Sequence, residues 1–416
     1  MAADVPSSPK GGPRDDLWLA ALGASRFFMV LVQMVYAACL PLLKTAWQMS
    51  ATQAGSVATG FQIGYAVSLF GFSTLADRLG ARRMLLTSAA ASAAAAVAFA
   101  LLARSYAAGL ALYTLVALAQ GGTYSGALML VADRYDAARR GSAMGWLIAS
   151  SSLSHAASLA IAGLALPRGG YPMAFALAAA GTALGATLAW AALRSTPNVV
   201  HPRGGGVRLR TEVLQNPDAM RLTVGYTFHS WELLGMWAWT PAFFAASLAA
   251  AGTPALRSVQ VGAYVAASLH VMGLLASSSM GALSDRLGRR RVLMLLAATS
   301  TACSLVFGWL IAAPIAVVAA VGALYGFSGL GDSPVLSAAL SEAVRPGYLG
   351  AALALRSFLG FGAGAVAPLV FGVILDVTNP PGSTPAVWGW AFSALGAGGL
   401  VATLCAYGLP RRSIGT

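Results

Sequence analysis

The sequence GALSDRLGRRR at residues 281–291 has a weaker copy 208 residues earlier, STLADRLGARR at residues 73–83. Each copy ends one long apolar segment and begins another, and each holds an acid, a base, a Gly and a basic cluster that hydrocarbon would not accept. We therefore expect each motif to form a short aqueous turn between two membrane helices. Because a long-period repeat indicates a repeated architecture, the chain is predicted to consist of two similar halves.

The composition is that of a membrane protein. Of the 416 residues, 58% are hydrophobic and 9% are charged, and the mean hydropathy is +0.72, which excludes a soluble domain of this size. Segments of about 20 apolar residues, the length that crosses a hydrocarbon core of ~30 Å, recur along the whole chain. The sequence predicts twelve transmembrane helices, at residues 17–43, 51–76, 84–103, 106–132, 141–166, 171–194, 222–250, 258–283, 292–312, 315–341, 350–376 and 386–409.

The net charge of +13 comes from the tails and turns. If the N-terminus is cytoplasmic, twenty of the 26 basic residues lie on the cytoplasmic side and only Lys44, Arg104, Arg168 and Arg257 lie on the other. This asymmetry follows the positive-inside rule. We expect a multi-pass protein of the cytoplasmic membrane with both termini in the cytoplasm, and no nucleic-acid partner is needed to explain the charge.

The polar stretch between the sixth and seventh helices holds the only run of glycines and no apolar span. It marks a boundary between two bundles of six helices. The predicted organisation is a cytoplasmic tail at 1–16, a bundle at 17–194, a cytoplasmic linker at 195–221, a second bundle at 222–409 and a tail at 410–416.

Two six-helix halves with this motif between their second and third helices resemble the major facilitator superfamily. The motif at 281–291 matches the family pattern G-x-L-x-D-R-x-G-R-R-x in full, whereas the one at 73–83 departs from it at Ser73 and Ala81. The resemblance covers essentially the whole chain. It implies an all-α fold of two pseudo-symmetric bundles around a central cavity that opens alternately to the two sides of the membrane.

The resemblance also implies a conformational role for the motif. An acid held against helix ends and arginines can latch one state and release another, because its pairing energy differs between them. The candidate latch residues are Asp77, Arg78, Asp285 and Arg286. The alternative is that the arginines only set the topology.

Ionisable residues inside membrane helices are functional candidates, because each costs about 2.5–3.5 kcal/mol at a helix centre. Seven fall in the predicted helices away from their terminal residues: Arg26, His155, His229, Glu232, His270, Asp332 and Arg356. None of them lies in the third, sixth, ninth or twelfth helix, which the resemblance places against lipid.

Arg26 always carries its charge and needs an anionic partner or hydrated space. We interpret it as an anion-binding group, with Gln33 seven residues further along the same helical face. Arg356 is a second candidate for this role. The alternative for both is a side chain that extends to the cytoplasmic interface, which is easier for Arg356.

His229 and Glu232 are three residues apart and share a helical face, so they could hydrogen-bond or exchange a proton. Asp332 lies in GLGDSP, where two glycines and a proline favour a kink or a short break beside a cavity. Burial favours the neutral acid and a nearby cation favours the carboxylate, so movement of an arginine could switch either acid between the two forms. We predict proton-coupling roles for these three residues; the alternative is permanent buried ion pairs.

Further polar residues are candidates for lining a substrate cavity, namely Gln62, Tyr124, His155 and His270. Close helix packing is the alternative, since small polar stripes serve it equally well. No spacing indicates a metal site, a phosphate loop or a catalytic nucleophile, so we expect no cofactor, no metal and no enzymatic activity.

The sequence thus predicts a monomeric secondary transporter in the lipid bilayer that moves a small organic anion, such as a carboxylate, by proton symport or anion exchange. Proton-coupled efflux of drugs or metabolites is the main alternative. Against it, the fourth helix lacks the Arg, and the fifth helix lacks the Gly-Pro run, of the family's drug antiporters. A transporter-like sensor without transport activity is a further alternative.

Overall fold

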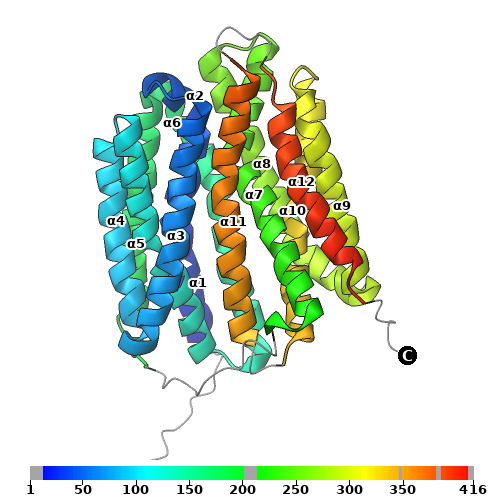
Figure 1. Ribbon diagram of the computed structural model, residues 1–416. Coiled ribbons are helices and arrows are strands. Elements are labelled where there is room, and N and C mark those ends of the chain that lie inside the picture. The colour runs from blue at the N-terminus through cyan, green and yellow to red at the C-terminus, as the bar shows by residue number, and fades with distance from the viewer. Residues whose placement is uncertain (1–12, 201–212, 346–348, 381–385, 411–416) are drawn as a thin grey trace, which may run out of the picture.

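The structure, a computed structural model, describes residues 13–200, 213–345, 349–380 and 386–410, and the regular elements of these ranges are helices (Figure 1). They are α1 (Pro13–Val30), α2 (Val32–Ala46), α3 (Ala51–Leu79), α4 (Ala81–Leu102), α5 (Tyr106–Arg134), α6 (Ala137–Leu193), α7 (Pro217–Ala250), α8 (Ala255–Leu287), α9 (Arg289–Phe307), the short 3₁₀ helix η2 (Gly308–Leu310), α10 (Ile315–Ala343), α11 (Leu349–Thr378) and α12 (Gly389–Tyr407).

The 57 residues of α6 form two membrane crossings. Its backbone is non-helical at Gly169 and Gly170. Both ends of α6 lie at the same end of the molecule, because Arg139 pairs with Asp16 near the start of α1 and Leu193 accepts a hydrogen bond from Arg82 at the start of α4. Ten described stretches are long and apolar enough to cross a membrane. Counting α6 twice and adding α3, the described helices agree with the twelve predicted crossings.

The helices form two halves, α1–α6 and α7–α12, which stand side by side in Figure 1. This confirms the all-α fold with two bundles. The beginning of α1 and the end of α12 lie at the lower end of that view, here called the termini end; the opposite end is the far end. Helix α7 begins at Pro217, five residues before the predicted boundary, with Asn216 as its N-cap. The rest of the predicted linker lies partly outside the described residues.

The repeated motif is more helical than predicted. Helices α3 and α4 are separated by Gly80 alone, and α8 and α9 by Gly288 alone. Each Gly has a positive φ, 89° and 87°, which ends one helix and starts the next within a single residue. The expected aqueous turn was therefore wrong in detail, because the four latch candidates lie in the last turns of α3 and α8.

In the second copy of the motif, ion pairs join three helices of one half. Arg289 lies 2.5 Å from the carboxylate of Asp285 and 2.9 Å from that of Glu342 on α10. Arg289 also donates a hydrogen bond to Ser284. The pairing of Asp285 thus lies within the second half in this conformation, and the latch role remains a prediction.

The first crossing was predicted as one continuous helix; α1 and α2 are separated by Leu31 alone, whose backbone angles remain helical. Two serine hydroxyls of α6 donate hydrogen bonds to backbone carbonyls at this position. Ser154 donates to Phe27 at 2.5 Å, and Ser158 donates to Leu31 at 2.5 Å. Hydroxyl donors of this kind can satisfy backbone carbonyls inside a membrane where the regular helical hydrogen bonds are interrupted.

The two halves meet at the far end. A Cβ added to Gly55 of α3 would lie 2.2 Å from the carbonyl oxygen of Pro368 on α11, and one added to Gly163 of α6 would lie 2.6 Å from Tyr264 on α8. At the termini end the same faces separate. Gly145, about five turns before Gly163 on one face of α6, would meet nothing within 4 Å, and Phe358, near the start of α11, is 68% exposed. The space between the halves therefore opens to the termini end.

An acid of the second half completes the cap of a helix in the first. Ser50 is the N-cap of α3 and forms a capping box with Gln53. The next two amides, of Ala51 and Thr52, donate to the carboxylate of Asp376 on α11 at 2.8 Å and 2.7 Å. The first four N–H groups of α3 are thereby satisfied, two of them from across the interface.

Substituting Gly55 with Val is expected to destabilise this conformation by about 1–3 kcal/mol, the usual effect of overpacking. The reason is that the atom in the way belongs to the backbone of α11 and has no rotamer to change. Thermal unfolding in detergent measures the effect. Gly71→Val is the matched control on the same helix, since a Cβ at Gly71 meets nothing within 4 Å. Equal unfolding temperatures for the two variants would contradict this view of the interface.

Candidate functional site

Arg26 of α1 is buried, with 5% of its surface exposed. Its guanidinium donates to the hydroxyls of Ser151 at 2.9 Å, Thr123 at 3.0 Å and Tyr65 at 3.4 Å, and it lies over the ring of Tyr124 at 4.8 Å. Among the described residues, none of its partners is an acid. The charge is therefore solvated by neutral groups and is not neutralised.

Arg356 of α11 is in the same situation in the other half. It is 8% exposed, donates to the hydroxyl of Ser337 at 2.8 Å, and lies 4.1 Å from the ring centre of Tyr226. Its Nε atom is buried with no hydrogen-bond partner. Within the described chain, this arginine also has no acidic partner, so a donor and a full positive charge remain unused.

Aromatic residues connect the two arginines across the interface. Tyr65, which accepts from Arg26, lies 6.4 Å from Phe361 of α11, ring centre to ring centre. Tyr124 interacts electrostatically with both Arg26 and Arg356. The two uncompensated cations, one from each half, therefore face a common region that contains the Tyr124 phenol.

Gln33 shares a face of the first crossing with Arg26, as predicted, because both side chains contact α5 and α6. Its side-chain oxygen is 2.9 Å from Nε2 of His155, and its amide donates to Gln120 at 2.7 Å. Gln120 in turn donates to the carbonyl of Met29 at 2.7 Å. These contacts hold the ring of His155 in place. Gln62 is half-buried, and the described residues offer its side chain no hydrogen bond.

His155 and His270, from different halves, are brought together with Trp237 of α7. The ring centres are 5.2 Å apart for His155 and Trp237, 5.3 Å for the two histidines, and 5.4 Å for Trp237 and His270. This three-ring cluster joins α6, α7 and α8 where the halves meet.

The predicted proton-coupling residues lie inside the second half. Nδ1 of His229 is 3.0 Å from Oδ1 of Asp332, although the two atoms are not aligned for a hydrogen bond, and Nε2 of His229 is 2.9 Å from the hydroxyl of Ser333. Glu232 accepts from Ser300 of α9 at 3.0 Å. The expected hydrogen bond between His229 and Glu232 is absent from the described contacts, because each side chain has found a partner on a different helix.

Comparison with known proteins identifies the family. The profile of the Major Facilitator Superfamily matches residues 22–280, which is more than half of the chain. The chain belongs to the Major Facilitator Superfamily. It is therefore a multi-pass membrane transporter. A search of curated proteins gave no match.

Solved structures of superfamily members share the fold. A bacterial homologue of the human lysosomal transporter Spinster, in an inward-facing and unoccupied conformation, has a TM-score of 0.71 and 16% identity, with 95% of this chain and 96% of that chain covered. A mutant of the nucleoside transporter NupG has a TM-score of 0.75 and 14% identity, with 94% and 98% covered. At these identities, the comparison supports the superfamily fold and does not identify a substrate.

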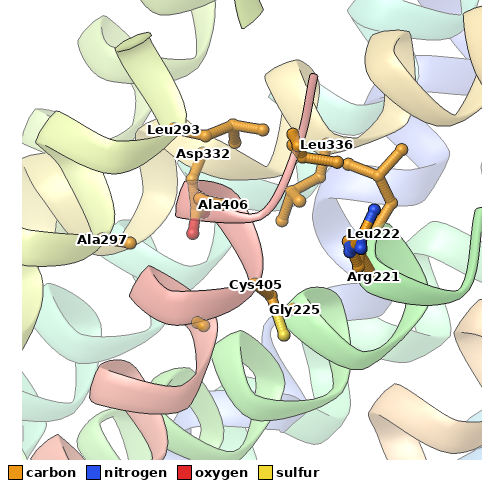
Figure 2. Close-up of a pocket in the computed structure, with 11 residues that line it drawn as sticks. Arg221, Leu222, Gly225, Leu293, Ala297, Asp332, Leu336, Cys405 and Ala406 are labelled. Carbon is orange, nitrogen blue, oxygen red and sulfur yellow. The ribbon is translucent and has the colours of Figure 1, made fainter. Parts of the chain in front are cut away.

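Asp332 also lines a pocket within the second bundle of this superfamily member (Figure 2). The eleven residues around it come from α7, α9, α10 and α12, with Leu409 just after α12. They include Arg221 and Cys405. None of them belongs to the first half. Of the kink or short break predicted at GLGDSP, the break is not present, since α10 is one helix with Pro334 inside it.

Several residues of the site were not singled out from the sequence. Tyr226, Trp237 and Ser337 contact the arginines or the ring cluster, and Asp376 caps α3 from the other half. A superfamily resemblance indicates which helices line the cavity, but it does not say which residues of each helix face it. Tyr226 and Arg356 lie on different helices, so their contact leaves no spacing signal in the sequence.

Proposed function

We propose that this protein is a secondary transporter of small organic anions such as carboxylates, and that Arg26 and Arg356 bind the anion from the two halves. The observation that supports it is the burial of both arginines without an acidic partner in the described chain. A guanidinium cannot lose its proton at ordinary pH, so a buried one without a counter-ion is suited to binding an anion. Its planar fork of donors matches a carboxylate.

The same arrangement supports anion exchange. One arginine belongs to each half, and alternating access requires the halves to move around the site. Closing an empty site would exclude water from two like charges, which is costly where the effective dielectric constant is low. A bound anion offsets that cost, so the loaded protein would change state more readily than the empty one.

Proton symport is the second candidate, supported by the buried pair of His229 and Asp332 between α7 and α10. Glu232 lies in the same region. Neither acid touches an arginine within the described residues, so coupling would act through the relative positions of α7, α10 and α11.

Drug or metabolite efflux requires an acid that faces the substrate cavity. Glu232 and Asp332 are each 5% exposed, and their nearest partners lie within the second half. Efflux is therefore less well supported in this conformation, although aromatic side chains do surround the arginines.

A thermal-shift screen of the purified protein tests the proposal, because a ligand that binds only the folded state raises its apparent stability. The panel contains small carboxylates, sulfonates, sugars, amines and lipophilic cations. Stabilisation by carboxylates supports the proposal, and stabilisation by lipophilic cations alone would contradict it. Counterflow of a stabilising carboxylate in vesicles then separates a transporter from a sensor, which would bind it without moving it.

Replacing Asp332 with Asn is expected to abolish the response of uptake to a proton gradient while exchange continues, if symport operates. The reason is that Asn cannot take up or release the proton that the pair with His229 would carry. Uptake into vesicles with and without an imposed gradient measures this. Glu232→Gln is the parallel variant for the acid bound by Ser300. Wild-type uptake that ignores the gradient would leave exchange as the mechanism.

A further inference from the structure

The three-ring cluster of His155, Trp237 and His270 presents unused hydrogen-bonding groups. The indole Nε1 of Trp237 is buried and has no hydrogen-bond partner. His270 is 6% exposed, and its ring nitrogens make no hydrogen bond among the described contacts. Buried N–H groups are nearly always paired, and leaving one unpaired is costly, so each unpaired one needs an explanation.

These groups border a pocket. Trp237 and His270 line it together with Thr240, and its remaining walls are apolar, including Leu159 of α6 and Leu269 of α8. The hydroxyl of Thr240 is already bonded to the carbonyl of Met236. Two groups without a hydrogen-bond partner among the described residues therefore border this pocket: the indole of Trp237, whose N–H is buried, and the imidazole of His270.

The ring cluster is close to the anion site. Arg26 acts electrostatically on His155, and His155 is held by Gln33 on the crossing that also carries Arg26. Tyr65 and Tyr124 add aromatic surface at Arg26 itself. A ligand whose carboxylate binds Arg26 would therefore place the rest of its body beside aromatic rings contributed by both halves.

We propose that the transported anion is an aromatic carboxylate with a hydrogen-bond acceptor on or near its ring, and that His155, Trp237 and His270 form its ring subsite. This inference rests on the proposed anion-binding function and adds the substrate class. Aromatic rings in edge-to-face or offset-stacked contact attract one another, and this attraction adds to the free energy gained by burying them. A pocket built around a buried donor also discriminates against ligands that leave that donor unpaired.

Three carboxylates of similar size separate the contribution of the aromatic ring to binding from that of the hydrogen-bond acceptor. Benzoate has the ring, cyclohexanecarboxylate has a saturated ring of the same connectivity, and pyridine-3-carboxylate adds an acceptor nitrogen. Isothermal titration of the full-length protein in detergent gives their dissociation constants. We expect benzoate to bind ~5-fold more tightly than cyclohexanecarboxylate, and pyridine-3-carboxylate to bind ~5-fold more tightly than benzoate.

Two substitutions of Trp237 test the two features separately. Trp237→Phe keeps an aromatic ring and removes the N–H, so the preference for pyridine-3-carboxylate over benzoate should disappear while that for benzoate over cyclohexanecarboxylate remains. Trp237→Leu should remove both preferences. The readout is a ratio of affinities within one variant, so a uniform change in the population of the binding-competent state cancels.

The outcomes separate this inference from the proposed function. Equal binding of benzoate and cyclohexanecarboxylate by wild type, with both lost in Arg26→Ala, would overturn the ring subsite and leave the anion site standing. Unchanged preferences in Trp237→Leu would also overturn the subsite. Failure of all three carboxylates to bind wild type, while another small carboxylate of the thermal-shift panel stabilises it, would overturn this inference alone. Failure of every anion of that panel would overturn the proposed function with it.

Discussion

Replacing Arg26 with Ala is expected to weaken carboxylate binding by roughly 30-fold to several thousandfold. This range corresponds to the about 2–5 kcal/mol that is lost when one partner of a buried, hydrogen-bonded charge pair is removed. In the free protein the guanidinium contacts only hydroxyls and an aromatic ring, so its loss leaves no buried carboxylate unpaired. The variant should therefore still fold. Isothermal titration with benzoate measures the binding, and thermal unfolding measures the stability.

Two controls accompany Arg26→Ala. Arg26→Lys keeps the charge but loses the planar fork, so intermediate binding is expected. Arg168→Ala removes a charge from the far end, where the side chain is exposed and donates to a carbonyl of its own helix, and it should bind like wild type. Wild-type affinity in Arg26→Ala would exclude this arginine from the anion site.

Replacing Asp376 with Ala is expected to shift the conformational equilibrium away from the state described here. Its carboxylate accepts the amides of Ala51 and Thr52 across the halves, and these bonds cannot survive if the far end opens. Loss of a cap at a helix N-terminus costs about 2 kcal/mol at most, which corresponds to a ~30-fold change in the ratio of the two states.

Electron–electron resonance distances can measure this shift. Spin labels at Arg104 and Arg257, which are exposed and lie beside the far-end turns of the two halves, report the opening directly. Asp218→Ala is the control, because it removes an ion pair with Arg221 that lies within one half. A distance distribution for Asp376→Ala that matches wild type would show that this cap does not hold the halves together.

The sequence was sufficient to predict the membrane helices and the two-fold organisation. Hydropathy is a property of consecutive residues, and hydrocarbon imposes the same requirement on every crossing, so the helices could be placed to within a few residues. The exceptions have local causes. The interruption at Leu31 lies beside two carbonyls that accept hydrogen bonds from hydroxyls of α6, and the motif glycines end helices more sharply than a charged turn would suggest.

The list of buried ionisable residues also came from the sequence, because a charge in an apolar segment is conspicuous. The groups that these residues contact could not be predicted from the sequence. Arg26 and Arg356 could have paired with Glu232 or Asp332; the structure instead gives the arginines hydroxyls and tyrosine rings, and gives the acids partners within the second half.

What the sequence determined by itself is therefore the number and order of the apolar helices and which of them carry charge. Which groups meet was decided by the tertiary structure. The capping of Ala51 by Asp376 joins residues 325 positions apart, and the cluster of His155, Trp237 and His270 joins three helices from two halves. Such contacts depend on how each helix is rotated about its axis and packed against its neighbours. The local sequence specifies that a segment is helical and which residues share a face, but not which neighbour that face contacts.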